Sequence, residues 1–265
     1  MRVVTVANQK GGTGKTTLAI HMAAWLAKSG RPVVLVDLDT QGSVARFLGL
    51  DKADDVAELL SATLLLRPDR RPPLSSFLCP VPGYPDLVVI RGWERSANLD
   101  GDLRRPGVRP AGEILADALA PLQGRTGLFV VIDTGPYAGL LQEAALSIAD
   151  HVIVPGKPEA ATEDGILDIA RRLKAVGRGI TAVIPTLWVA TAKEHRTTIE
   201  DWQRTLGPAV YYDPKSRLWG LPRRVIWGEI VRYGRPIWDL APDDVAAREM
   251  RTVLERVAYD AKIQG

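Results

Sequence analysis

The stretch that decides the fold is Asn8-Gln9-Lys10-Gly11-Gly12-Thr13-Gly14-Lys15-Thr16-Thr17, near the start of a 265-residue chain. It lies between an apolar run, residues 2–7, and a segment, residues 16–28, whose apolar residues recur at helical spacing. A glycine-rich turn between a strand and a helix can bind phosphate, because its backbone N–H groups turn inward and the helix start adds further donors. The predicted phosphate contacts come from Gly11, Gly12, Thr13, Gly14, Lys15, Thr16 and Thr17.

Three side chains give this loop its expected chemistry. Lys15 places a positive charge at the β- and γ-phosphates of a nucleotide, and the Thr16 hydroxyl can ligate Mg²⁺. The common pattern G-x-x-x-x-G-K-[ST] is not met literally, because Gln9 stands at its first glycine. Instead a second lysine, Lys10, precedes the two glycines. The alternative for the loop is a glycine-rich turn that binds no ligand, and the alternative for Lys10 is a solvated loop lysine.

Carboxylates follow two strongly apolar runs. Residues 33–36 lead into Asp37, and Asp39 lies two positions further on, so strand alternation points both side chains to the same side. Residues 128–132 lead into Asp133, and a carboxylate in this position typically holds Mg²⁺. Ligands bind at the carboxyl edge of open parallel sheets, where these residues should meet. Each aspartate could instead only cap the following helix or turn.

The rest of the chain alternates between strand-like and helix-like segments. Unbroken Val/Ile/Leu strands between helices predict an α/β fold with a predominantly parallel, doubly wound sheet, as in P-loop NTPases. We expect a single domain over residues 1–265, with residues 61–110 irregular except for one strand at 87–90. A strand near 209–212 and a terminal helix over 243–259 complete the prediction.

Composition excludes several classes of protein. The net charge is only +3, and the longest apolar runs are strand-sized, far below the roughly 20 residues of a membrane span. The start of the chain lacks the apolar segment of a signal peptide, so a cytoplasmic location is expected. The single cysteine, Cys79, permits no internal disulfide and disfavours a cysteine-bound iron–sulfur cluster.

The run Lys-Gly-Gly-x-Gly-Lys-Thr-Thr resembles the deviant Walker A motif of ParA and MinD ATPases, and the chain looks most similar to small Soj-like ParA proteins. The resemblance implies that ATP and Mg²⁺ are bound in a homodimer in which Lys10 reaches the partner's phosphates. It implies catalytic roles for Lys10, Lys15 and Asp39, with Asp39 handling the attacking water. The metal residues it implies are Thr16, Asp37 and Asp133.

The resemblance continues along most of the chain. Residues 144–155 match a helix-and-strand pattern of the family, and residues 221–225 and 233–237 resemble the segment where ParA proteins contact adenine and then form a helix. Pro222 and Arg223 are therefore expected at the adenine, although a loop packed on the sheet edge is the alternative. After Asp133 the family usually has two consecutive prolines, whereas this chain has Thr134-Gly135-Pro136.

The resemblance to ParA also implies an output, which is non-specific DNA binding in the ATP state and release by a ParB-like or other cargo adaptor. The cargo could be a plasmid, a chromosome or a protein body, and the protein would associate with the nucleoid. Residues 193–235 carry nine basic and five acidic side chains, which is also typical of a solvated face. The predicted DNA contacts are Arg196, Arg223, Arg224, Arg232 and Arg235.

Two other outputs remain open. A MinD-like membrane-positioning ATPase would need an amphipathic C-terminal helix, but residues 253–265 look more like a helix packed on the domain, so no membrane partner is expected. A metabolic enzyme, such as an amide-forming synthetase or a reductase like the nitrogenase iron protein, could use the same loop. The single cysteine disfavours the reductase.

Overall fold

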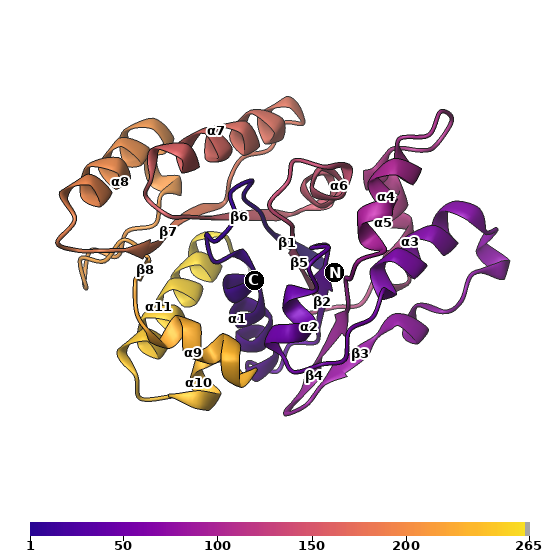
Figure 1. Cartoon of the computed structure of the whole chain (residues 1–265), viewed down its shortest axis with the longest axis horizontal. Helices are drawn as coiled ribbons and strands as arrows, with labels where there is room; N and C mark the ends of the chain where they lie inside the picture. Colours follow the sequence, from indigo (N-terminus) through magenta and orange to yellow (C-terminus); the bar gives the residue numbers. More distant parts are fainter. Residues whose placement is uncertain (263–265) are drawn as a thin grey trace.

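The computed structural model describes residues 1–262, with only the backbone of Ala160, and shows a sheet with helices on both faces (Figure 1). The strands are β1 (Arg2–Val6), β2 (Val33–Asp37), β3 (Cys79–Val81), β4 (Tyr84–Ile90), β5 (Phe129–Asp133), β6 (His151–Gly156), β7 (Ala182–Trp188) and β8 (Leu221–Pro222). The helices are α1 (Lys15–Lys28), α2 (Ser43–Phe47), α3 (Asp55–Leu65), α4 (Ser96–Leu103), α5 (Ala111–Ala118), α6 (Leu140–Ile148), α7 (Ala160–Ala175), α8 (Lys193–Leu206), α9 (Ile226–Tyr233), α10 (Ile237–Leu240) and α11 (Val245–Asp260).

The strand order is β3-β4-β2-β5-β1-β6-β7-β8, and every paired neighbour is parallel except β3 with β4. β1 lies in the middle, between β5 and β6. Parallel strands present their carboxyl ends at one edge, so the loop that follows β1 lies beside the loops that follow β2 and β5. The predicted α/β fold, with its mostly parallel, doubly wound sheet, is confirmed.

Alternate residues of the central strands supply two separate cores. Val33 and Leu35 of β2 pack with α1 and α11, whereas Val34 and Val36 pack with α3, α5 and α6. Because successive side chains of a strand point to opposite faces, continuous apolar runs are needed to cover both. The helices on the two faces explain why these strands read as unbroken Val/Ile/Leu.

The region expected to be irregular contains more regular structure than the sequence suggests. The strand predicted at 87–90 belongs to a longer β4, which pairs with β3 in an antiparallel hairpin. Prolines at 80, 82 and 85 disguised this hairpin: Pro80 is in the edge strand β3, Pro82 is in the turn, and Pro85 precedes the part of β4 that pairs with β2. α4 was also missed, because its buried apolar residues are only Leu99 and Leu103.

In the C-terminal part of the chain, the structure differs from the prediction at one strand and agrees with it at the terminal helix. The strand predicted near 209–212 is a single bridge between Val210 and Val183, because residues 207–209 form a 3₁₀ turn. The terminal helix is α11, which buries Met250, Val253 and Leu254 against the core, as expected for a packed helix. Residues 263–265 of the predicted tail lie outside the described residues. Within residues 1–262, each helix falls short of the length or apolar content that crossing a bilayer requires.

A buried histidine joins the phosphate-loop helix to the C-terminal helices. His21 of α1 is fully buried; its Nδ1–H donates to the Thr17 carbonyl at 2.6 Å, and its Nε2 accepts from the N–H of Ile237 at 3.0 Å. Its ring meets those of Phe47, Trp227 and Trp238 edge to face. Burial lowers the pKa of His21 to about 4, because the charged form would lose its hydration.

This depressed pKa predicts an acid-sensitive contribution to stability. The unfolded chain binds a proton near pH 6.5 and the folded chain only near pH 4, so the contribution is full above 6.5 and is lost as the pH falls toward 4. We expect the wild type to lose about 3 kcal/mol of unfolding free energy relative to His21→Gln over this range. Urea unfolding of both proteins at pH 7 and pH 4.5 measures the difference. Parallel losses in the two proteins would contradict the assignment.

Candidate nucleotide-binding site

A cavity of about 270 Å³ lies at the carboxyl ends of the central strands, over the start of α1. It is formed by the glycine loop, by α2, by the segment after β5 and by α9. The lining residues are Gly11, Gly12, Thr13, Gly14, Lys15, Thr16, Thr17, Asp39, Ser43, Arg46, Phe47, Pro136 and Val231. The structure therefore brings residues 11–17 of the predicted loop into the cavity wall together with Asp39, and leaves Lys10 outside it.

The glycine loop has the backbone expected of a phosphate cradle. Gly12 and Gly14 have positive φ angles of 72° and 84°, a region that favours glycine, and Gly14 is the residue that precedes α1. The Lys15 ammonium donates to the Lys10 carbonyl at 2.9 Å, so it curls back over the loop. The buried Thr186 hydroxyl of β7 donates to the Thr13 carbonyl at 2.8 Å. The loop is thus shaped before any phosphate arrives.

Asp133 is the strongest indication of a missing cation. It is fully buried at the end of β5, and neither of its carboxylate oxygens has a hydrogen-bond partner of good geometry among the described residues. Burial raises the pKa of Asp133 to about 7, and the charge of Asp39 adds to this, whereas the nearby Thr16 hydroxyl and Lys15 ammonium oppose it. A buried carboxylate without partners beside a hydroxyl fits Mg²⁺ held between Thr16 and Asp133.

Lys15 is a buried positive charge, whereas Asp133 is a buried negative one. It is 6% exposed, and burial lowers its pKa, although the charges of Asp133 and Asp39 partly restore it. A polyphosphate would supply the negative charge that this ammonium lacks. No group of three or more His, Cys, Asp or Glu side chains within residues 1–262 is arranged to hold a metal alone. The residues therefore fit a cation that binds together with a nucleotide.

The metal role of Asp37 stays a prediction, and its contacts in the structure also fit the alternative, a cap on the following helix. Both of its oxygens already accept backbone N–H groups, one from Asp39 at 3.0 Å and the other from Val44 at 3.1 Å. Asp37 therefore caps α2 and fixes the turn that leads to it, which was the alternative interpretation. Burial, with the charge of Asp133 next, raises its pKa well above the usual range. Its role in this structure is to position the first acidic segment.

Asp39 keeps the place expected of a residue that handles water. It is 8% exposed and lines the cavity, and its Oδ1 accepts the N–H of Gln41 at 3.1 Å. Lys10 is different, because its side chain does not line the cavity; its backbone N–H donates to the Asn8 side chain at 2.9 Å. The predicted role of the Lys10 side chain at phosphate stays a prediction.

Sequence reasoning missed the walls of the cavity that come from α2 and α9. Arg46 is exposed and lines the cavity beside Phe47, and Val231 of α9 closes the opposite side. The spacing of Ser43, Arg46 and Phe47 on one short helix after Asp39 was a usable signal for α2. Nothing local to Val231 connects it to a loop more than 200 positions away.

The predicted site residues at positions 222–224 lie outside the cavity wall. Pro222 and Arg223 do not line the cavity, and the Pro222 carbonyl accepts from the Trp227 indole at 3.0 Å, so their adenine contact stays a prediction. Arg224 is held by Glu249 of α11, with its Nε at 2.7 Å from a carboxylate oxygen that is largely buried. Arg224 is therefore a structural residue, and its predicted DNA contact is not supported.

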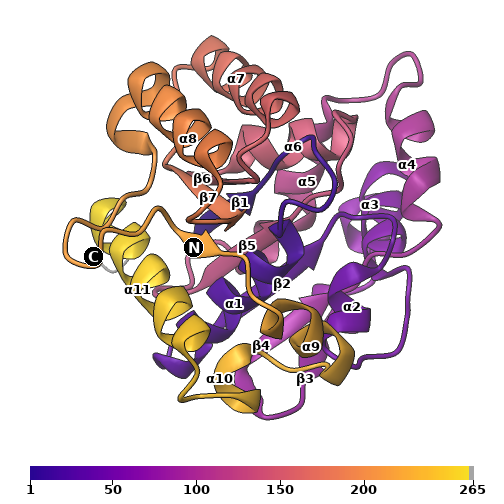
Figure 2. The same cartoon turned by 60° about the vertical axis from the view of Figure 1, so that its left-hand side comes forward.

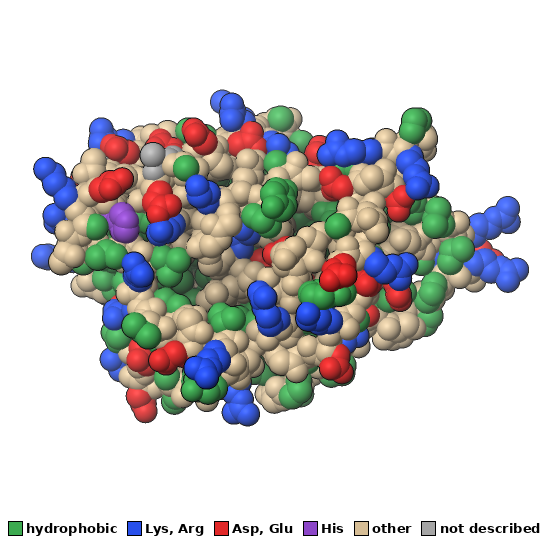
Figure 3. Space-filling view, viewed as in Figure 1, with side chains coloured by type: hydrophobic (Ala, Val, Ile, Leu, Met, Phe, Trp, Pro, Cys, Tyr) green, Lys and Arg blue, Asp and Glu red, His purple; other side chains and the backbone are tan. Residues whose placement is uncertain are grey.

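The remaining predicted DNA contacts lie on two separate elements. Arg223, Arg232 and Arg235 lie on or next to α9 and are exposed. Arg196 is on α8, which lies apart from α9 and α10 in both views (Figure 1, Figure 2). Basic and acidic side chains are intermixed over the face in Figure 3. A continuous patch of all the predicted arginines is therefore not observed.

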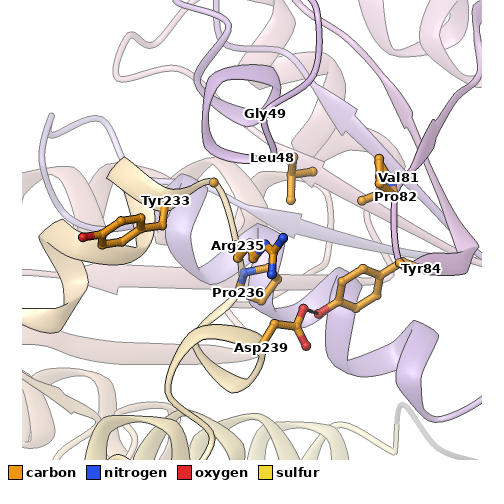
Figure 4. Close-up of a pocket in the computed structure, with 11 residues that line it drawn as sticks. Leu48, Gly49, Val81, Pro82, Tyr84, Tyr233, Arg235, Pro236 and Asp239 are labelled. Carbon is orange, nitrogen blue, oxygen red and sulfur yellow. Dashed lines mark hydrogen bonds between the residues drawn. The ribbon is translucent and has the colours of Figure 1, made fainter.

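Another hollow, of about 530 Å³, lies next to Leu48 and Gly49, which follow α2 (Figure 4). The β3–β4 turn and the α9–α10 connection form its walls, with Arg235 facing the hydrogen-bonded pair of Tyr84 and Asp239. None of the phosphate-loop residues lines it. The nucleotide site is therefore the smaller cavity at the strand ends.

Comparisons with known proteins agree with this site. A family model described as an AAA domain matches residues 1–184. The chromosome partitioning protein ParA of Myxococcus xanthus is 30% identical over 246 residues, which are 89% of this chain and 80% of that protein. The chain belongs to the ParA family of P-loop ATPases. The chromosome-partitioning ATPase Soj of Thermus thermophilus is 29% identical, over 97% of this chain and 95% of its own.

Solved structures support the same fold for this ParA-family protein. Apo McdA of Cyanothece superposes with a TM-score of 0.79 over 97% of this chain and 99% of its own, at 18% identity. Cobyrinic acid a,c-diamide synthase from Mycobacterium smegmatis, with bound ADP and magnesium, gives a TM-score of 0.68 at 28% identity, over 88% and 91%. Membership of the family makes this chain an ATP-binding P-loop NTPase.

The buried Asp133 predicts opposite effects on the free and the liganded ParA-family protein. Its pKa lies above the unfolded value, so its charge destabilises the free protein increasingly as the pH rises from about 4 to 7. Asp133→Asn should therefore stabilise the free protein by roughly 2 kcal/mol at pH 8, and by less at pH 5. The same variant should lose most of the thermal shift that Mg²⁺ and ATP give the wild type. Equal melting temperatures at both pH values, with ligand stabilisation intact, would refute the metal assignment.

Proposed function

We propose that this ParA-family protein hydrolyses Mg²⁺-bound ATP as a nucleotide-dependent homodimer that binds DNA without sequence specificity and segregates or positions a cargo. The observation that supports it most is the unpaired, fully buried Asp133 beside Lys15 and Thr16 in a glycine-rich cavity. Burying the Asp133 carboxylate and the Lys15 ammonium destabilises the free protein. A metal–polyphosphate complex would stabilise both, because the metal binds the carboxylate and the phosphates bind the ammonium.

The chain's own residues divide the work of phosphoryl transfer. The loop amides and Lys15 bind the phosphates and stabilise negative charge on the leaving oxygen. Thr16 and Asp133 would hold Mg²⁺, which neutralises phosphate charge when it is bound. Asp39, fixed by the Gln41 N–H, orients the attacking water and accepts its proton. Asp37 and Thr186 hold the two segments that carry these groups.

The dimer is proposed because the active site of one chain lacks its second lysine. Lys10 is next to the cavity in sequence, but only its backbone serves the loop. A lysine that arrives from the partner would make hydrolysis depend on assembly, as an arginine finger does. ADP would then release the dimer, since the contact to the third phosphate is lost.

The first test separates assembly from hydrolysis. We expect ATP, but not ADP, to shift the wild type to a dimer in size-exclusion chromatography. Asp39→Ala should retain ATP and remain dimeric while its turnover falls by about 100-fold, because water activation is lost. Lys10→Ala should bind ATP but fail to show coupled turnover. Lys174→Ala, an exposed lysine on α7, is the matched control for the loss of a lysine.

Those variants can also defeat the proposal. Full turnover by Lys10→Ala, or an ATP-bound monomer of the wild type that hydrolyses at the same rate at every protein concentration, would rule out the trans lysine. Turnover by Asp39→Ala at the wild-type rate would remove Asp39 from the chemistry.

DNA binding is proposed for the exposed arginines around α9. Arg223, Arg232 and Arg235 form no ion pair with any residue in 1–262, whereas Arg224 is bound to Glu249. Phosphate contacts dominate non-specific affinity, so a few free guanidinium groups per protomer, doubled in a dimer, are sufficient. Arg196 on α8 would contact DNA only if the duplex spanned both elements.

The corresponding prediction uses charge reversal. Arg223→Glu with Arg232→Glu should weaken DNA binding in ATP by at least about tenfold and make its salt dependence less steep. Fluorescence anisotropy with a labelled duplex at several salt concentrations measures both. Arg251→Glu with Lys174→Glu is the control with the same charge change, at exposed basic residues of α11 and α7 outside this region. Equal weakening by the control would show that only net charge matters.

A metabolic enzyme is the second candidate, and one observation favours it. The diamide synthase resembles this chain at 28% identity, which is more than McdA does. Against it, two curated relatives that match most of this chain, ParA of Myxococcus xanthus and Soj of Thermus thermophilus, are named as chromosome-partitioning proteins. ATP turnover that responds to DNA, and not to carboxylic acids with glutamine or ammonia, would separate the two. The MinD-like alternative is tested by co-sedimentation with liposomes, and α11, packed into the core, argues against it.

A further inference from the structure

A second cavity, of about 280 Å³, lies against the nucleotide cavity and shares Asp39 and Pro136 with it. Its walls are the first acidic segment, the segment after β5, and the helices α4 and α6, which pack together (Figure 1). The lining residues are Leu38, Asp39, Thr40, Ser96, Ala97, Asp100, Gly135, Pro136, Tyr137, Gly139, Leu141 and Gln142. The proposed function assigns nothing to this cavity.

Two buried polar side chains in its wall have no partner. Ser96 is fully buried and its hydroxyl makes no hydrogen bond within residues 1–262. Gln142 is 2% exposed; its Oε1 is also unpartnered, and its amide N–H reaches only the Gly135 carbonyl at 3.5 Å. Buried polar atoms are nearly always satisfied, so two orphans around one cavity indicate a ligand with hydrogen-bond donors.

The charge of the cavity is opposite to that of its neighbour. The nucleotide cavity contains Lys15 and Arg46, whereas the charged side chains in this wall are Asp39 and Asp100, with no Lys, Arg or His among its described lining residues. Asp100 is only partly neutralised, because its Oδ2 meets the exposed Arg104 at 3.2 Å and its Oδ1 accepts the Leu140 N–H at 2.9 Å. The unpartnered oxygens of Ser96 and Gln142 require donors, and the two carboxylates favour a ligand with positive charge.

We propose that this cavity binds a guanidinium or ammonium group, held by Ser96, Gln142 and Asp100 beside Asp39. The volume of the cavity accommodates a side chain the size of arginine, and Tyr137, which is 79% exposed, stands at its rim to cover the aliphatic part. The group can come from a free amine or from a basic side chain of a polypeptide. Both sources present the same planar or tetrahedral donors to the same oxygens.

The position of the site gives the bound cation a regulatory role, which rests on the proposed hydrolysis. A cation here contacts the back of the segment that carries Asp39 and the Gly135–Gly139 turn, so it favours one arrangement of both. Binding itself needs no nucleotide. The proposal of a cation site and the proposal of ATP hydrolysis can therefore be disproved independently of each other.

The test is titration of the full chain with agmatine, by calorimetry and without nucleotide. We expect saturable binding with a Kd of about 1 mM, typical of one small cation in a partly open site. Asp100→Asn should weaken it about fivefold, because a charge-assisted contact is lost while the acceptor for Leu140 remains. Asp102→Asn is the matched control: Asp102 is on the same helix and pairs with Arg105, but it does not line the cavity.

Ser96→Ala provides a second variant that should fold normally, because it only removes a buried hydroxyl without a partner. It should weaken agmatine binding about threefold and leave the melting temperature of the free protein unchanged or higher. Equal affinities for the wild type, Asp100→Asn and Ser96→Ala, or no saturable binding up to about 20 mM, would overturn the proposal.

A capped tripeptide with a central arginine, compared with its citrulline counterpart, identifies the source of the cation. Tighter binding of the arginine peptide than of agmatine indicates a polypeptide ligand, and the reverse indicates a free amine; both support a cation site. Binding of the neutral citrulline peptide as tight as that of arginine would refute the charge argument. If ATP turnover is absent but agmatine binds as predicted, the proposed function fails and this site stands.

Discussion

The confinement of negative charge at the ends of β2 and β5 is the constraint on which the rest of the structure depends. Asp37, Asp39 and Asp133 are all buried; the charge of Asp39 raises the cost of ionising both Asp37 and Asp133, and the charge of Asp133 adds to the cost at Asp37. Different groups stabilise each of the three carboxylates. Backbone amides satisfy Asp37, and one amide serves Asp39, which also lines the cavity. Asp133 is stabilised mainly by the nearby Thr16 and Lys15.

The segments that carry these carboxylates and the glycine loop must be held in place, because a small displacement would bring the carboxylates closer together or change the shape of the loop. Thr186 holds the glycine loop from β7, and the Arg224–Glu249 pair ties the segment after β8 to α11. A partly buried pair of this kind contributes little net stability, but it holds the two segments in a defined geometry. The two cavities on either side of Asp39 then differ in charge, so the aspartate lies at the boundary between an anion site and a cavity lined by acidic and neutral groups.

The phosphate loop, Asp39 and Asp133 could be predicted because their signals are local: glycines between a strand and a helix, and carboxylates after apolar runs. The parallel sheet followed from the same runs. Val231 could not be found, because its place in the cavity depends on how α9 packs, whereas the spacing of Arg46 on the short helix after Asp39 was a signal that went unused. Arg224 looked like a surface cation, since the sequence does not show that Glu249, 25 positions later, will meet it. Prolines hid the β3–β4 hairpin because the sequence does not state which strand is at an edge.

The wall contributed by Val231 has a consequence for synthesis of the chain. The ribosome releases the glycine loop more than two hundred residues before α9, and the loop's support at Thr186 also emerges late. The matched AAA-domain region, residues 1–184, ends before both. A nascent chain therefore carries the acidic corner for much of its translation without the elements that complete the pocket. Nucleotide capture would then mark the completion of the chain, and unfinished chains would remain without ligand.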